Sequence, residues 1–597
     1  MTHELLATTD RWIAGDPDPT TQRELADLRA RHVAGPDGET RAGDTLALRM
    51  SEQLEFGTAG LRGLVGAGPG RLNRATVIRA THGLCAWLAA QVPGAAERGV
   101  CIGFDARPDS RRFAHDVAAV VAGAGMVARL FEDFAPTPLV GFAVRDQHAA
   151  AGVVITASHN PPEYNGYKVF WEHGAQIVPP HDEGIAAAIA SAPPANAVPQ
   201  RAETDARAAG LRVTLGDDVR ERYVEGVLAL RPLPPSVNGA RALRVAYTPL
   251  HGVGLATVST VLARAGYTDV HVVASQAAPD GTFPTVRFPN PEEPGALDAL
   301  RTLAGEVRAD LAVANDPDAD RLAVLAPHPD GHWEALSGNE IGCLLADYLL
   351  STGDAGEPRV VINTIVSSPM LGVIASAHGA AFAQTLTGHK WIHARAMQEE
   401  AAGRRFVFGY EEALGYAAGS LVRDKDGISA LVLFCDLAAR EQARGSSVLR
   451  ARDELLRRHG AYVSLQESWV LPGADGQQVI RGVMERANAL DVGSLGGVPL
   501  LARLSGRDAT RRLVDGRTEA LGWAPSDLLV LELEGGQRAM LRPSGTEPKL
   551  KLYFDGRAEP REGEPIAEAR ARAQQVAKAI RDDLVERLGG APARPLS

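Results

Sequence analysis

Ser158 lies in a polar turn, residues 156–162 (Thr-Ala-Ser-His-Asn-Pro-Pro), which follows an apolar run ending at Ile155. The run from 150 to 155 predicts a buried strand, and the two prolines prevent a helix from starting at once because each removes a backbone N–H. A serine hydroxyl on a loop at a strand end stands where α/β domains usually place their chemistry. Most loop serines only cap helices or form turns, so a catalytic role needs partners elsewhere in the chain.

Three aspartates at alternate positions form a second polar loop after another predicted buried strand. Asp316, Asp318 and Asp320 directly follow the run 310–314 and its neighbour Asn315. On a helix the middle carboxylate would point away from the other two, whereas a loop can turn all three toward one ion. Such close carboxylates repel one another unless a cation neutralises them, and hard oxygen ligands suit Mg²⁺ or Ca²⁺. We therefore predict a metal site, with an acidic solvated turn as the alternative.

Two familiar motifs are disfavoured by individual residues. The acidic loop is not an EF-hand, because Arg321 replaces the glycine at position six and Pro327 replaces the glutamate at position twelve. Around Gly252 and Gly254 the chain resembles the start of a dinucleotide-binding fingerprint, but Thr257 stands where that pattern requires a small residue. This stretch is therefore interpreted as a tight strand-to-helix turn. The sequence also lacks the G-K-[ST] ending of a Walker motif, so hydrolysis of nucleoside triphosphates has no support.

Two loops have the composition of phosphate-binding sites. Residues 56–63 (Phe-Gly-Thr-Ala-Gly-Leu-Arg-Gly) are rich in glycine, which lets the backbone approach a ligand, and Arg62 could present a planar fork to a phosphate. Residues 542–549 (Arg-Pro-Ser-Gly-Thr-Glu-Pro-Lys) offer an arginine, two hydroxyls and backbone N–H groups for a terminal phosphate. For the first loop, a glycine-rich turn with a solvated arginine is the alternative.

Two further loops could handle protons and hydroxyl groups. His389 stands beside Lys390, which places a proton-transfer group next to a cation, although the histidine could simply be hydrogen-bonded within a turn. Residues 409–415 (Gly-Tyr-Glu-Glu-Ala-Leu-Gly) contain two carboxylates. These could accept hydrogen bonds from sugar hydroxyls or favour the N-terminus of a helix.

Strand and helix signals alternate along most of the 597 residues, a pattern typical of an α/β protein built from βαβ units. The chain is too long for a single core, and about 150 residues per domain suggests about four domains. Proline-rich sequence near 179–218 is expected to lead toward the end of the first domain, and a hinge is expected near 457–475. The predicted domains are 1–225 with the serine loop, 226–333 with the acidic loop, 334–470 with the glutamate loop, and 471–597.

The overall composition and charge argue against several classes of protein. With 45% hydrophobic and 23% charged residues, the chain has the composition of an ordinary globular protein. A net charge of −11 argues against a general nucleic-acid binder. The four cysteines are scattered, so neither a disulfide framework nor a structural zinc site is expected. No apolar stretch approaches the ~20 residues of a membrane span, and no signal peptide is evident, so we expect a cytoplasmic enzyme.

Taken together and in this order, five motifs resemble the α-D-phosphohexomutase family. They are the loop 56–63, the serine loop, the acidic loop with Arg321, the glutamate loop and the loop 542–549. The resemblance spans about residues 50 to 555 and implies four domains around a central cleft: three related α/β domains with mixed sheets and a C-terminal α+β domain. It also implies an isomerase of the phosphotransferase type that uses a phosphoserine, one Mg²⁺ per chain and a bisphosphorylated sugar intermediate.

The resemblance implies a role for each matching residue. Ser158 would carry the phosphoryl group, and Asp316, Asp318 and Asp320 would hold Mg²⁺ together with a phosphoserine oxygen. Lys168 is the preferred group for moving the hydroxyl proton, His159 is the other candidate, and Arg62 would assist phosphoryl transfer. The positions implied for substrate binding are Arg321, His389, Lys390, Glu411, Arg542, Ser544, Gly545 and Thr546.

The family resemblance leaves the sugar open. Relatives specialised for glucose phosphate often have serine where this chain has Ala413, and the loop looks more like the branch with bacterial phosphoglucomutase/phosphomannomutase proteins, phosphopentomutases and glucose-bisphosphate synthases. We predict interconversion of glucose 1-phosphate and glucose 6-phosphate, with glucose 1,6-bisphosphate as intermediate and activator. Mannose phosphate is the main alternative, and pentose phosphate or bisphosphate synthesis is another. The expected partners are small sugar phosphates, with a monomer or homodimer as the assembly.

Two hypotheses come from other classes of protein. A serine hydrolase could use Ser158 and His159, but the G-x-S-x-G elbow is missing and the acidic loop would then have no role. A non-catalytic sugar-phosphate-binding protein is the other alternative, and the complete set of serine, metal and phosphate loops argues against it.

Overall fold

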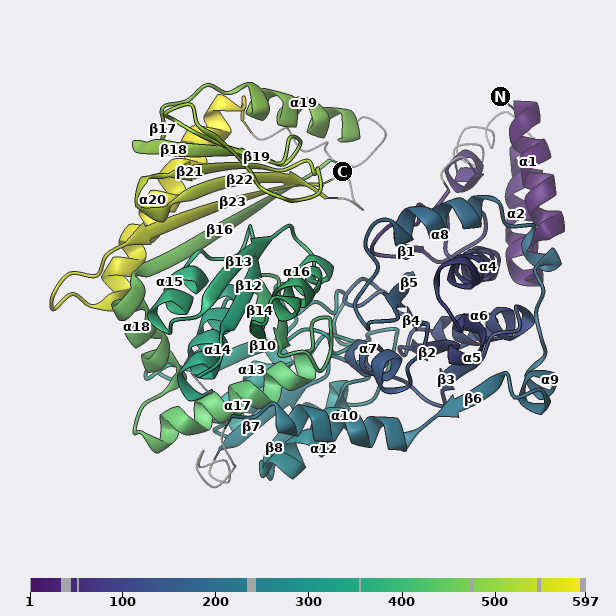
Figure 1. The fold of residues 1–597 in the computed structure, drawn as a ribbon, viewed down its shortest axis with the longest axis horizontal. Coiled ribbons are helices and arrows are strands. Elements are labelled where there is room, and N and C mark those ends of the chain that lie inside the picture. Colours follow the sequence, from purple (N-terminus) through teal and green to yellow (C-terminus); the bar gives the residue numbers. More distant parts are fainter. Residues whose placement is uncertain are drawn as a thin grey trace. The chain divides into compact units, whose positions relative to one another are not determined.

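The computed structural model describes residues 2–33, 45–50, 53–232, 243–353, 356–471, 476–544 and 549–590. The chain divides into two compact units (Figure 1). Unit 1 comprises Met1–Ile341 and His389–Gly445, and unit 2 comprises Gly342–Gly388 and Ser446–Ser597.

The first sheet of unit 1 carries the serine loop. Its six strands have the order β1-β5-β4-β2-β3-β6, in which β4, β2, β3 and β6 are parallel while β5 and β1 are antiparallel to their neighbours. The strands are β1 (Leu61–Leu64), β2 (Val100–Phe104), β3 (Ala128–Phe131), β4 (Ala151–Ile155), β5 (Tyr164–Trp171) and β6 (Arg212–Leu215). Strand β6 lies within the proline-rich region near 179–218 and forms one edge of this sheet.

Helices cover both faces of this first sheet. Alternate residues of a strand point to opposite faces, so Ile102 and Phe104 of β2 join the core with Phe113, whereas a Cβ on Gly103 would lie 2.3 Å from Val140. Helix α6 (Ser110–Gly123) therefore covers one face and α7 (Thr137–Asp146) the other. The remaining helices of this region are α1 (Thr2–Gly15), α2 (Pro19–Val33), α4 (Arg74–Gln91), α5 (Ala95–Arg98), α8 (His181–Ala190), α9 (Glu203–Ala208), α10 (Asp217–Ala229) and the 3₁₀ turn η1 (Ala195–Ala197).

The second sheet of unit 1 carries the acidic loop. Its order is β11-β10-β9-β7-β8, with β9, β7 and β8 parallel and two antiparallel strands added beside β9. The acidic loop joins β9 to β10. The elements are β7 (Arg244–Thr248), α12 (Leu255–Ala265), β8 (Asp269–Val272), η3 (Ala274–Gln276), α13 (Asp298–Glu306), β9 (Leu311–Ala314), β10 (Ala323–Pro327) and β11 (Trp333–Ala335).

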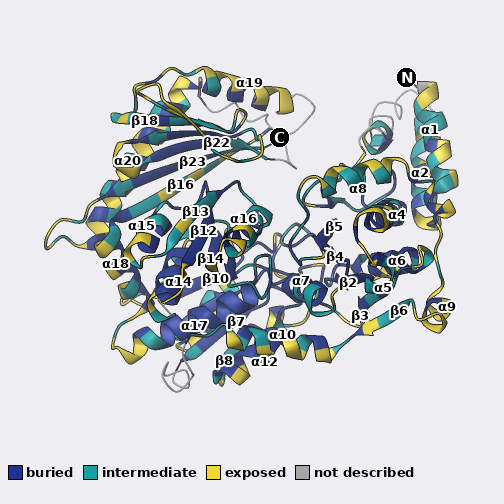
Figure 2. Cartoon of the chain, in the orientation of Figure 1, coloured by how far each residue is buried: buried dark blue, intermediate teal, exposed yellow. Residues whose placement is uncertain are grey.

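Residues 389–445 complete unit 1 with the glutamate loop and a buried helix. Helix α16 (His389–Ala401) precedes the hairpin of β14 (Arg405–Glu411) and β15 (Gly415–Ala418), and α17 (Gly427–Ala443) follows. Figure 2 shows α17 buried along most of its length, which fits its run of apolar residues. Asp426 caps this helix by accepting hydrogen bonds from the backbone N–H groups of Ile428 and Ser429.

Unit 2 joins a short parallel pair to a large antiparallel sheet. The first part contains most of α14 (Gly338–Thr352), β12 (Arg359–Thr364), α15 (Met370–Ala377) and β13 (Ala381–Thr385), with β12 and β13 parallel. In the second part, α18 (Val448–His459) leads into a sheet of order β16-β23-β22-β21-β18-β19-β20 (Figure 1). Its elements are β16 (Ala461–Val470), α19 (Gly476–Ala489), β17 (Ser494–Leu495), β18 (Val498–Ser505), β19 (Thr510–Leu513), β20 (Thr518–Ala520), β21 (Leu529–Leu533), η4 (Glu534–Gly536), β22 (Arg538–Pro543), β23 (Lys549–Ala558) and α20 (Ile566–Arg587).

Helix α20, near the end of the chain, packs Ile580 and Leu584 against Phe554 of the large sheet. The predicted hinge near 457–475 contains the end of α18 and all of β16, while Pro472 and Gly473 lie outside the described residues.

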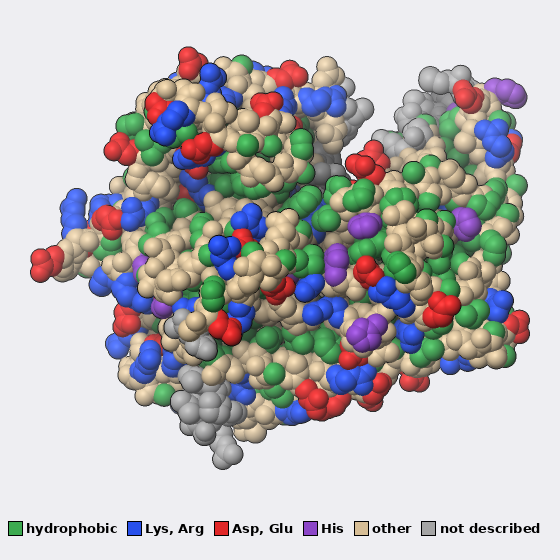
Figure 3. Space-filling view, in the orientation of Figure 1, with side chains coloured by type: hydrophobic (Ala, Val, Ile, Leu, Met, Phe, Trp, Pro, Cys, Tyr) green, Lys and Arg blue, Asp and Glu red, His purple; other side chains and the backbone are tan. Residues whose placement is uncertain are grey.

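The distribution of charged side chains on the surface is consistent with the net charge of −11. On the face shown in Figure 3, basic and acidic side chains are interspersed. Among the described residues, no helix has the length and apolar character needed to cross a membrane.

Candidate functional site

The structure brings the serine loop and the acidic loop into direct contact within unit 1. Ser158 follows β4, is 2% exposed and has a φ of +53°, a left-handed conformation that non-glycine residues seldom adopt. Its Oγ donates a hydrogen bond to Oδ2 of Asp316 at 2.7 Å and lies 3.2 Å from Nδ1 of His159. The serine oxygen is therefore held beside a carboxylate that is 158 positions away in the chain.

The serine loop is organised by Arg107, which follows β2 and is 3% exposed. Its Nε donates to Oδ2 of Asp105 at 3.1 Å, and its guanidinium lies 5.1 Å from the ring centroid of Phe283. The same guanidinium donates to four backbone carbonyls at 2.6–2.9 Å: those of Ser158, Asn160 and Pro161 in the serine loop and that of Tyr164 at the start of β5. Arg107 was not predicted; the sequence feature that could have identified it is the Asp-x-Arg pair directly after the residues of β2.

The three aspartates converge as the alternating pattern predicts. Asp316, Asp318 and Asp320 are all fully buried, and one ligand oxygen from each lies within 4.8 Å of the others. The loop turns tightly, with the Ala319 N–H donating to the carbonyl of Asp316 at 2.9 Å and Ala319 at a φ of +57°. The backbone N–H of Arg321 donates to Oδ1 of Asp316 at 3.0 Å, which fixes the first carboxylate.

The donor set fits a hard divalent cation. Oδ1 of Asp318 and Oδ1 of Asp320 are buried and accept no hydrogen bond from the described residues. Buried carboxylate oxygens without partners are costly, and three carboxylates together require positive charge. Oxygen-only ligands suit Mg²⁺ better than a transition metal. Asp316, Asp318 and Asp320 are thus the residues that could hold such an ion.

Two lysines already neutralise part of this charge. Nζ of Lys168, on β5, lies 2.8 Å from Oδ2 of Asp318 and 3.0 Å from Oδ2 of Asp320. Nζ of Lys425 lies 2.7 Å from the same oxygen of Asp320. Burial lowers the pKa of Lys168, but the two carboxylates outweigh it and hold that pKa above its ordinary value. Lys425 was not predicted; it lies in a charged run before α17 that looks like a solvated helix start.

The three carboxylates are not equivalent. Burial and the charges of Asp320 and Asp318 raise the pKa of Asp316 well above its ordinary value. Burial also acts on Asp320, but Lys168 and Lys425 outweigh it and lower the pKa of that carboxyl. Asp316, which faces the serine hydroxyl, is therefore the carboxylate with the least positive charge near it.

Further groups surround the serine and the aspartates. Nη1 of Arg62, on β1, lies 3.5 Å from Oδ1 of Asn160. Burial, with Arg321 and Arg62, holds the pKa of His159 well below its ordinary value, so its imidazole is neutral near neutral pH. Thr137, which begins α7, donates from Oγ1 to Oδ2 of Asp318 at 2.7 Å and from its N–H to the carbonyl of that aspartate at 3.0 Å. Thr137 was also not predicted; the sequence feature that could have identified it is a hydroxyl side chain between two prolines.

The glutamate loop packs against the acidic loop. Nη1 of Arg321 donates to the carbonyl of Ala413 at 2.9 Å, and the N–H of Leu322 donates to the carbonyl of Leu414 at 3.1 Å. Oε2 of Glu411 lies 3.8 Å from Nε2 of His389, which begins α16. Lys390 contacts the hydroxyl of Thr58 in the loop 56–63. The predicted residues of unit 1 therefore belong to one set of connected loops.

The predicted distal phosphate loop belongs to unit 2. Arg542 lies on β22, and the N–H of Ser544 donates to the carbonyl of Lys549 at 2.7 Å. Both side chains are half-buried. Gly545 and Thr546 lie outside the described residues.

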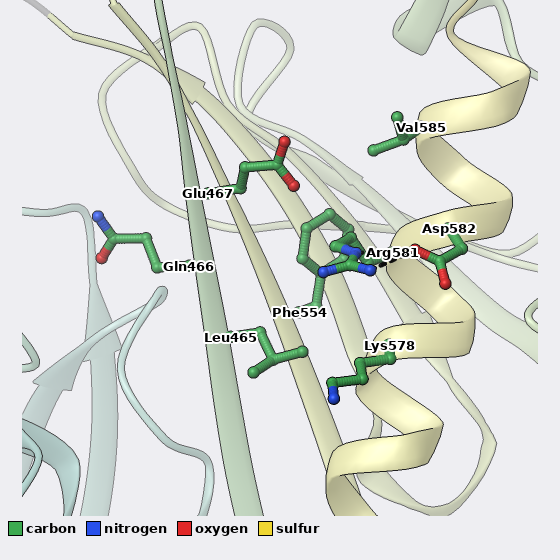
Figure 4. Close-up of a pocket in the computed structure, with 8 residues that line it drawn as sticks. All are labelled: Leu465, Gln466, Glu467, Phe554, Lys578, Arg581, Asp582 and Val585. Carbon is green, nitrogen blue, oxygen red and sulfur yellow. Dashed lines mark hydrogen bonds and ion pairs between the residues drawn. The ribbon is translucent and has the colours of Figure 1, made fainter. Parts of the chain in front are cut away.

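A separate hollow of about 540 Å³ lies in unit 2 between α20 and the strands β16 and β23 (Figure 4). Its polar lining is largely paired internally, since Arg581 bonds to Asp582 at 2.6 Å and Glu467 accepts from Nε1 of Trp469 at 2.7 Å. The residues around it are Leu465, Gln466, Glu467, Phe554, Lys578, Arg581, Asp582 and Val585. None of the predicted site residues that the structure describes lines this hollow.

Comparison with known proteins identifies the family. Sequence models of the phosphoglucomutase/phosphomannomutase family match four stretches, namely alpha/beta/alpha domain I at 53–195, domain II at 221–331, domain III at 337–455 and the C-terminal domain at 503–573. These matches confirm the predicted fold class of three α/β domains followed by a different C-terminal domain.

Relatives align over most of the chain. A probable phosphoribomutase of Schizosaccharomyces pombe is 37% identical over 96% of both chains. A probable phosphomannomutase of Haemophilus influenzae is 39% identical over 81% of this chain and 93% of its own. A mouse phosphopentomutase is 33% identical over 93% of this chain and 91% of its own.

A solved structure of a putative phosphomannomutase from Thermus thermophilus shares the fold, with a TM-score of 0.66, 21% identity and coverage of 90% of this chain and 100% of its own. The four matched domains and the full-length relatives together show that this chain is an enzyme of the α-D-phosphohexomutase family, an isomerase of the phosphotransferase type.

Proposed function

We propose that this enzyme moves a phosphoryl group between the C1 oxygen and the terminal hydroxyl of an aldose phosphate, with Ser158 as the phosphoryl carrier. The observation that carries the proposal is the hydrogen bond of 2.7 Å between Oγ of Ser158 and Oδ2 of Asp316. It places a hydroxyl nucleophile beside a buried cluster of metal-suited carboxylates. Phosphoryl transfer needs this neutralisation and alignment of charge more than it needs a special nucleophile.

Each proposed step forms one bond to phosphorus and breaks another, and both steps are reversible. In the first transfer, a hydroxyl oxygen of the sugar phosphate bonds to phosphorus, the bond between phosphorus and Oγ of Ser158 breaks, and a bisphosphorylated sugar results. In the second, Oγ of Ser158 takes the other phosphoryl group and the sugar oxygen leaves as a hydroxyl. A divalent cation on the three carboxylates, Mg²⁺ by the chemistry of its donors, would neutralise charge on the phosphoryl group.

Lys168, preferred from the sequence for moving the hydroxyl proton, is held protonated by Asp318 and Asp320, so it can donate a proton but not accept one. We therefore propose His159 as the acceptor, since its imidazole is neutral and its Nδ1 lies 3.2 Å from Oγ of Ser158. Arg62 would offset the charge of the phosphoryl oxygens. The distal phosphate of the substrate would bind the loop that contains Arg542, Ser544, Gly545 and Thr546 in the proposed C-terminal domain, 471–597.

For the sugar, we propose glucose 1-phosphate and glucose 6-phosphate as the pair, with glucose 1,6-bisphosphate as intermediate and activator. A pentose phosphate is the second candidate, because relatives that align over more than nine-tenths of this chain are called phosphoribomutase and phosphopentomutase. The relative called phosphomannomutase aligns over 81% of the chain and makes mannose phosphate the third.

Initial rates with glucose, mannose and ribose 1-phosphates, each with catalytic bisphosphate, test the sugar. A higher kcat/KM for ribose 1-phosphate would replace glucose as the substrate without affecting the proposed carrier. Intact-mass measurement tests the carrier separately: the wild type should gain one phosphoryl group from glucose 1,6-bisphosphate, and Ser158→Ala should gain none. Equal labelling of Ser158→Ala would refute the role of Ser158.

A further inference from the structure

A cluster of two histidines and an aspartate lies at the tip of a hairpin in unit 1, outside the site described above. The hairpin joins β10 to β11, whose register pairs Pro327 with Trp333. The next facing pair is His328 and His332, with the N–H of His328 donating to the carbonyl of His332 at 2.8 Å. Facing residues of an antiparallel pair project from the same side, so both imidazoles lie on one face.

The imidazoles are stacked with their ring centroids 4.4 Å apart and an angle of 25° between planes. Asp330, at the tip, points its carboxylate at the same edge of both rings. Oδ1 of Asp330 lies 2.9 Å from Nδ1 of His328 and is also in contact with Nδ1 of His332. The backbone N–H of His332 donates to this oxygen at 3.1 Å, which fixes the carboxylate.

We propose that His328, Asp330 and His332 form a surface site for a divalent transition-metal ion, with Zn²⁺ as the ligand that the chemistry favours. The three ligand atoms lie within 4.8 Å of one another. Two ligands each about 2.1 Å from one ion, at angles of about 90–109°, lie about 3.0–3.4 Å apart. The separation of 2.9 Å between Nδ1 of His328 and Oδ1 of Asp330 is close to that range.

The ligand types separate this site from the three aspartates of the acidic loop. Imidazole nitrogen is a good ligand for Zn²⁺, Ni²⁺ and Cu²⁺ and a poor one for Mg²⁺, which prefers oxygen. The three side chains are 39%, 59% and 56% exposed, so ions reach them directly and water can complete the coordination. Binding here does not depend on the proposed mutase reaction, and either proposal can fail without the other.

The alternative is a turn in which Nδ1–H of His332 donates to Asp330, Nδ1 of His328 accepts from the backbone N–H of Asp330 at 3.4 Å, and no ion binds. Titration calorimetry of the full chain with Zn²⁺ in excess Mg²⁺ tests this first. The wild type should bind one more Zn²⁺ than His332→Gln or the double variant His328→Gln/His332→Gln. The matched control is His271→Gln, because His271 is equally exposed and lies 2.8 Å from Asp269 but has no second histidine across a strand. The control should keep the full stoichiometry.

Electron paramagnetic resonance with Cu²⁺ identifies the ligand atoms. A signal with nitrogen hyperfine structure in the wild type and in His271→Gln, and its loss in His332→Gln, would support the site, because the three aspartates supply only oxygen. Equal Zn²⁺ stoichiometry in all variants, or a nitrogen signal that survives the double variant, would overturn it. Unchanged circular dichroism and mutase turnover in the variants show that the fold is intact.

Discussion

Arg107 contacts no reacting atom, yet the backbone of the serine loop depends on it. Its guanidinium donates to three carbonyl oxygens of that loop and to a fourth at the start of β5. A lysine ammonium is a point charge and cannot donate several hydrogen bonds in one plane as a guanidinium does. Replacing Arg107 with lysine would therefore not preserve these contacts. The loop conformation, including the left-handed backbone of Ser158, is therefore set by a residue that precedes it by about fifty positions.

We expect Arg107→Met to lower kcat by about 10²-fold, since a small displacement of a reacting group has that cost. Leaving Asp105 and the carbonyls unpaired should also destabilise the protein by about 3–5 kcal/mol. Arg107→Lys should keep more of the stability than of kcat, because it restores the pair with Asp105 but not the fork. Steady-state kinetics and urea unfolding measure both.

Arg111→Met is the control for Arg107→Met. Arg111 lies in the first turn of α6, which follows Arg107 in the chain; it is 51% exposed and stacks on Phe104 and Phe134. It should change kcat little. Equal kinetics for the two arginine variants would show that the carbonyl contacts do not position Ser158.

Lys425 competes with any ion for Asp320. Its Nζ lies 2.7 Å from Oδ2 of that carboxylate. We expect Lys425→Met to bind Mg²⁺ about tenfold more tightly, equivalent to about 1.4 kcal/mol, because a positive charge is removed from beside the ligands. Titration calorimetry measures this affinity, and Arg423→Met, which removes a nearby cation paired with Glu400, is the control. Weaker Mg²⁺ binding by Lys425→Met would contradict this prediction.

At the scale of elements, the start of helix α17 is packed against the backbone of the acidic loop. A Cβ on Gly427 would lie 2.2 Å from the carbonyl oxygen of Arg321 and 2.8 Å from Nδ2 of Asn315. Both partners belong to the segment that presents the aspartates. The helix therefore acts as a support for the acidic loop, and the glycine is the residue that allows the contact.

Gly427→Ala should cost about 1–3 kcal/mol in the free energy of unfolding, because the loop or the helix must move apart. The same displacement should weaken Mg²⁺ binding. Gly305→Ala is the matched control, since Gly305 is also helical and an added Cβ meets nothing within 4 Å. It should stabilise the protein by about 0.5–1 kcal/mol. Thermal and urea unfolding compare the two, and similar effects would remove the case for a support role.

The elements that the sequence predicts well are those defined by local pattern. The apolar runs before Ser158 and Asp316 become β4 and β9. The residues that were missed are far along the chain from their partners in the site. Arg107 is 51 positions from Ser158, Thr137 is 181 positions from Asp318, and Lys425 is 105 positions (425 − 320) from Asp320. Local periodicity cannot show such pairings, because they depend on which strands become neighbours.

At the scale of the whole molecule, each unit contains some of the predicted site residues. The serine, the aspartates and both lysines belong to unit 1, and Arg542 and Ser544 belong to unit 2. Three buried carboxylates face two ammonium groups at 2.7–3.0 Å and the Arg321 guanidinium at 4.0 Å. Oδ1 of Asp318 and Oδ1 of Asp320 still accept no hydrogen bond from the described residues, and a cation is the partner that suits them. Stability and activity of the full chain should therefore both depend on the bound ion.

We expect Mg²⁺ to raise the unfolding temperature of the full chain, since an ion that binds only the native state adds about 2.7 kcal/mol at a hundredfold excess over Kd. EDTA should abolish turnover and return the unfolding temperature to that of the ion-free protein. In Asp318→Asn the rise in unfolding temperature should be much smaller, because one ligand and its charge are lost. Asp298→Asn, at an exposed helix start in unit 1, is the control and should show the full rise. Differential scanning calorimetry of the wild type, Asp318→Asn and Asp298→Asn, each with and without Mg²⁺, tests this prediction. A full rise in Asp318→Asn would place the stabilising ion elsewhere and separate the acidic loop from metal binding.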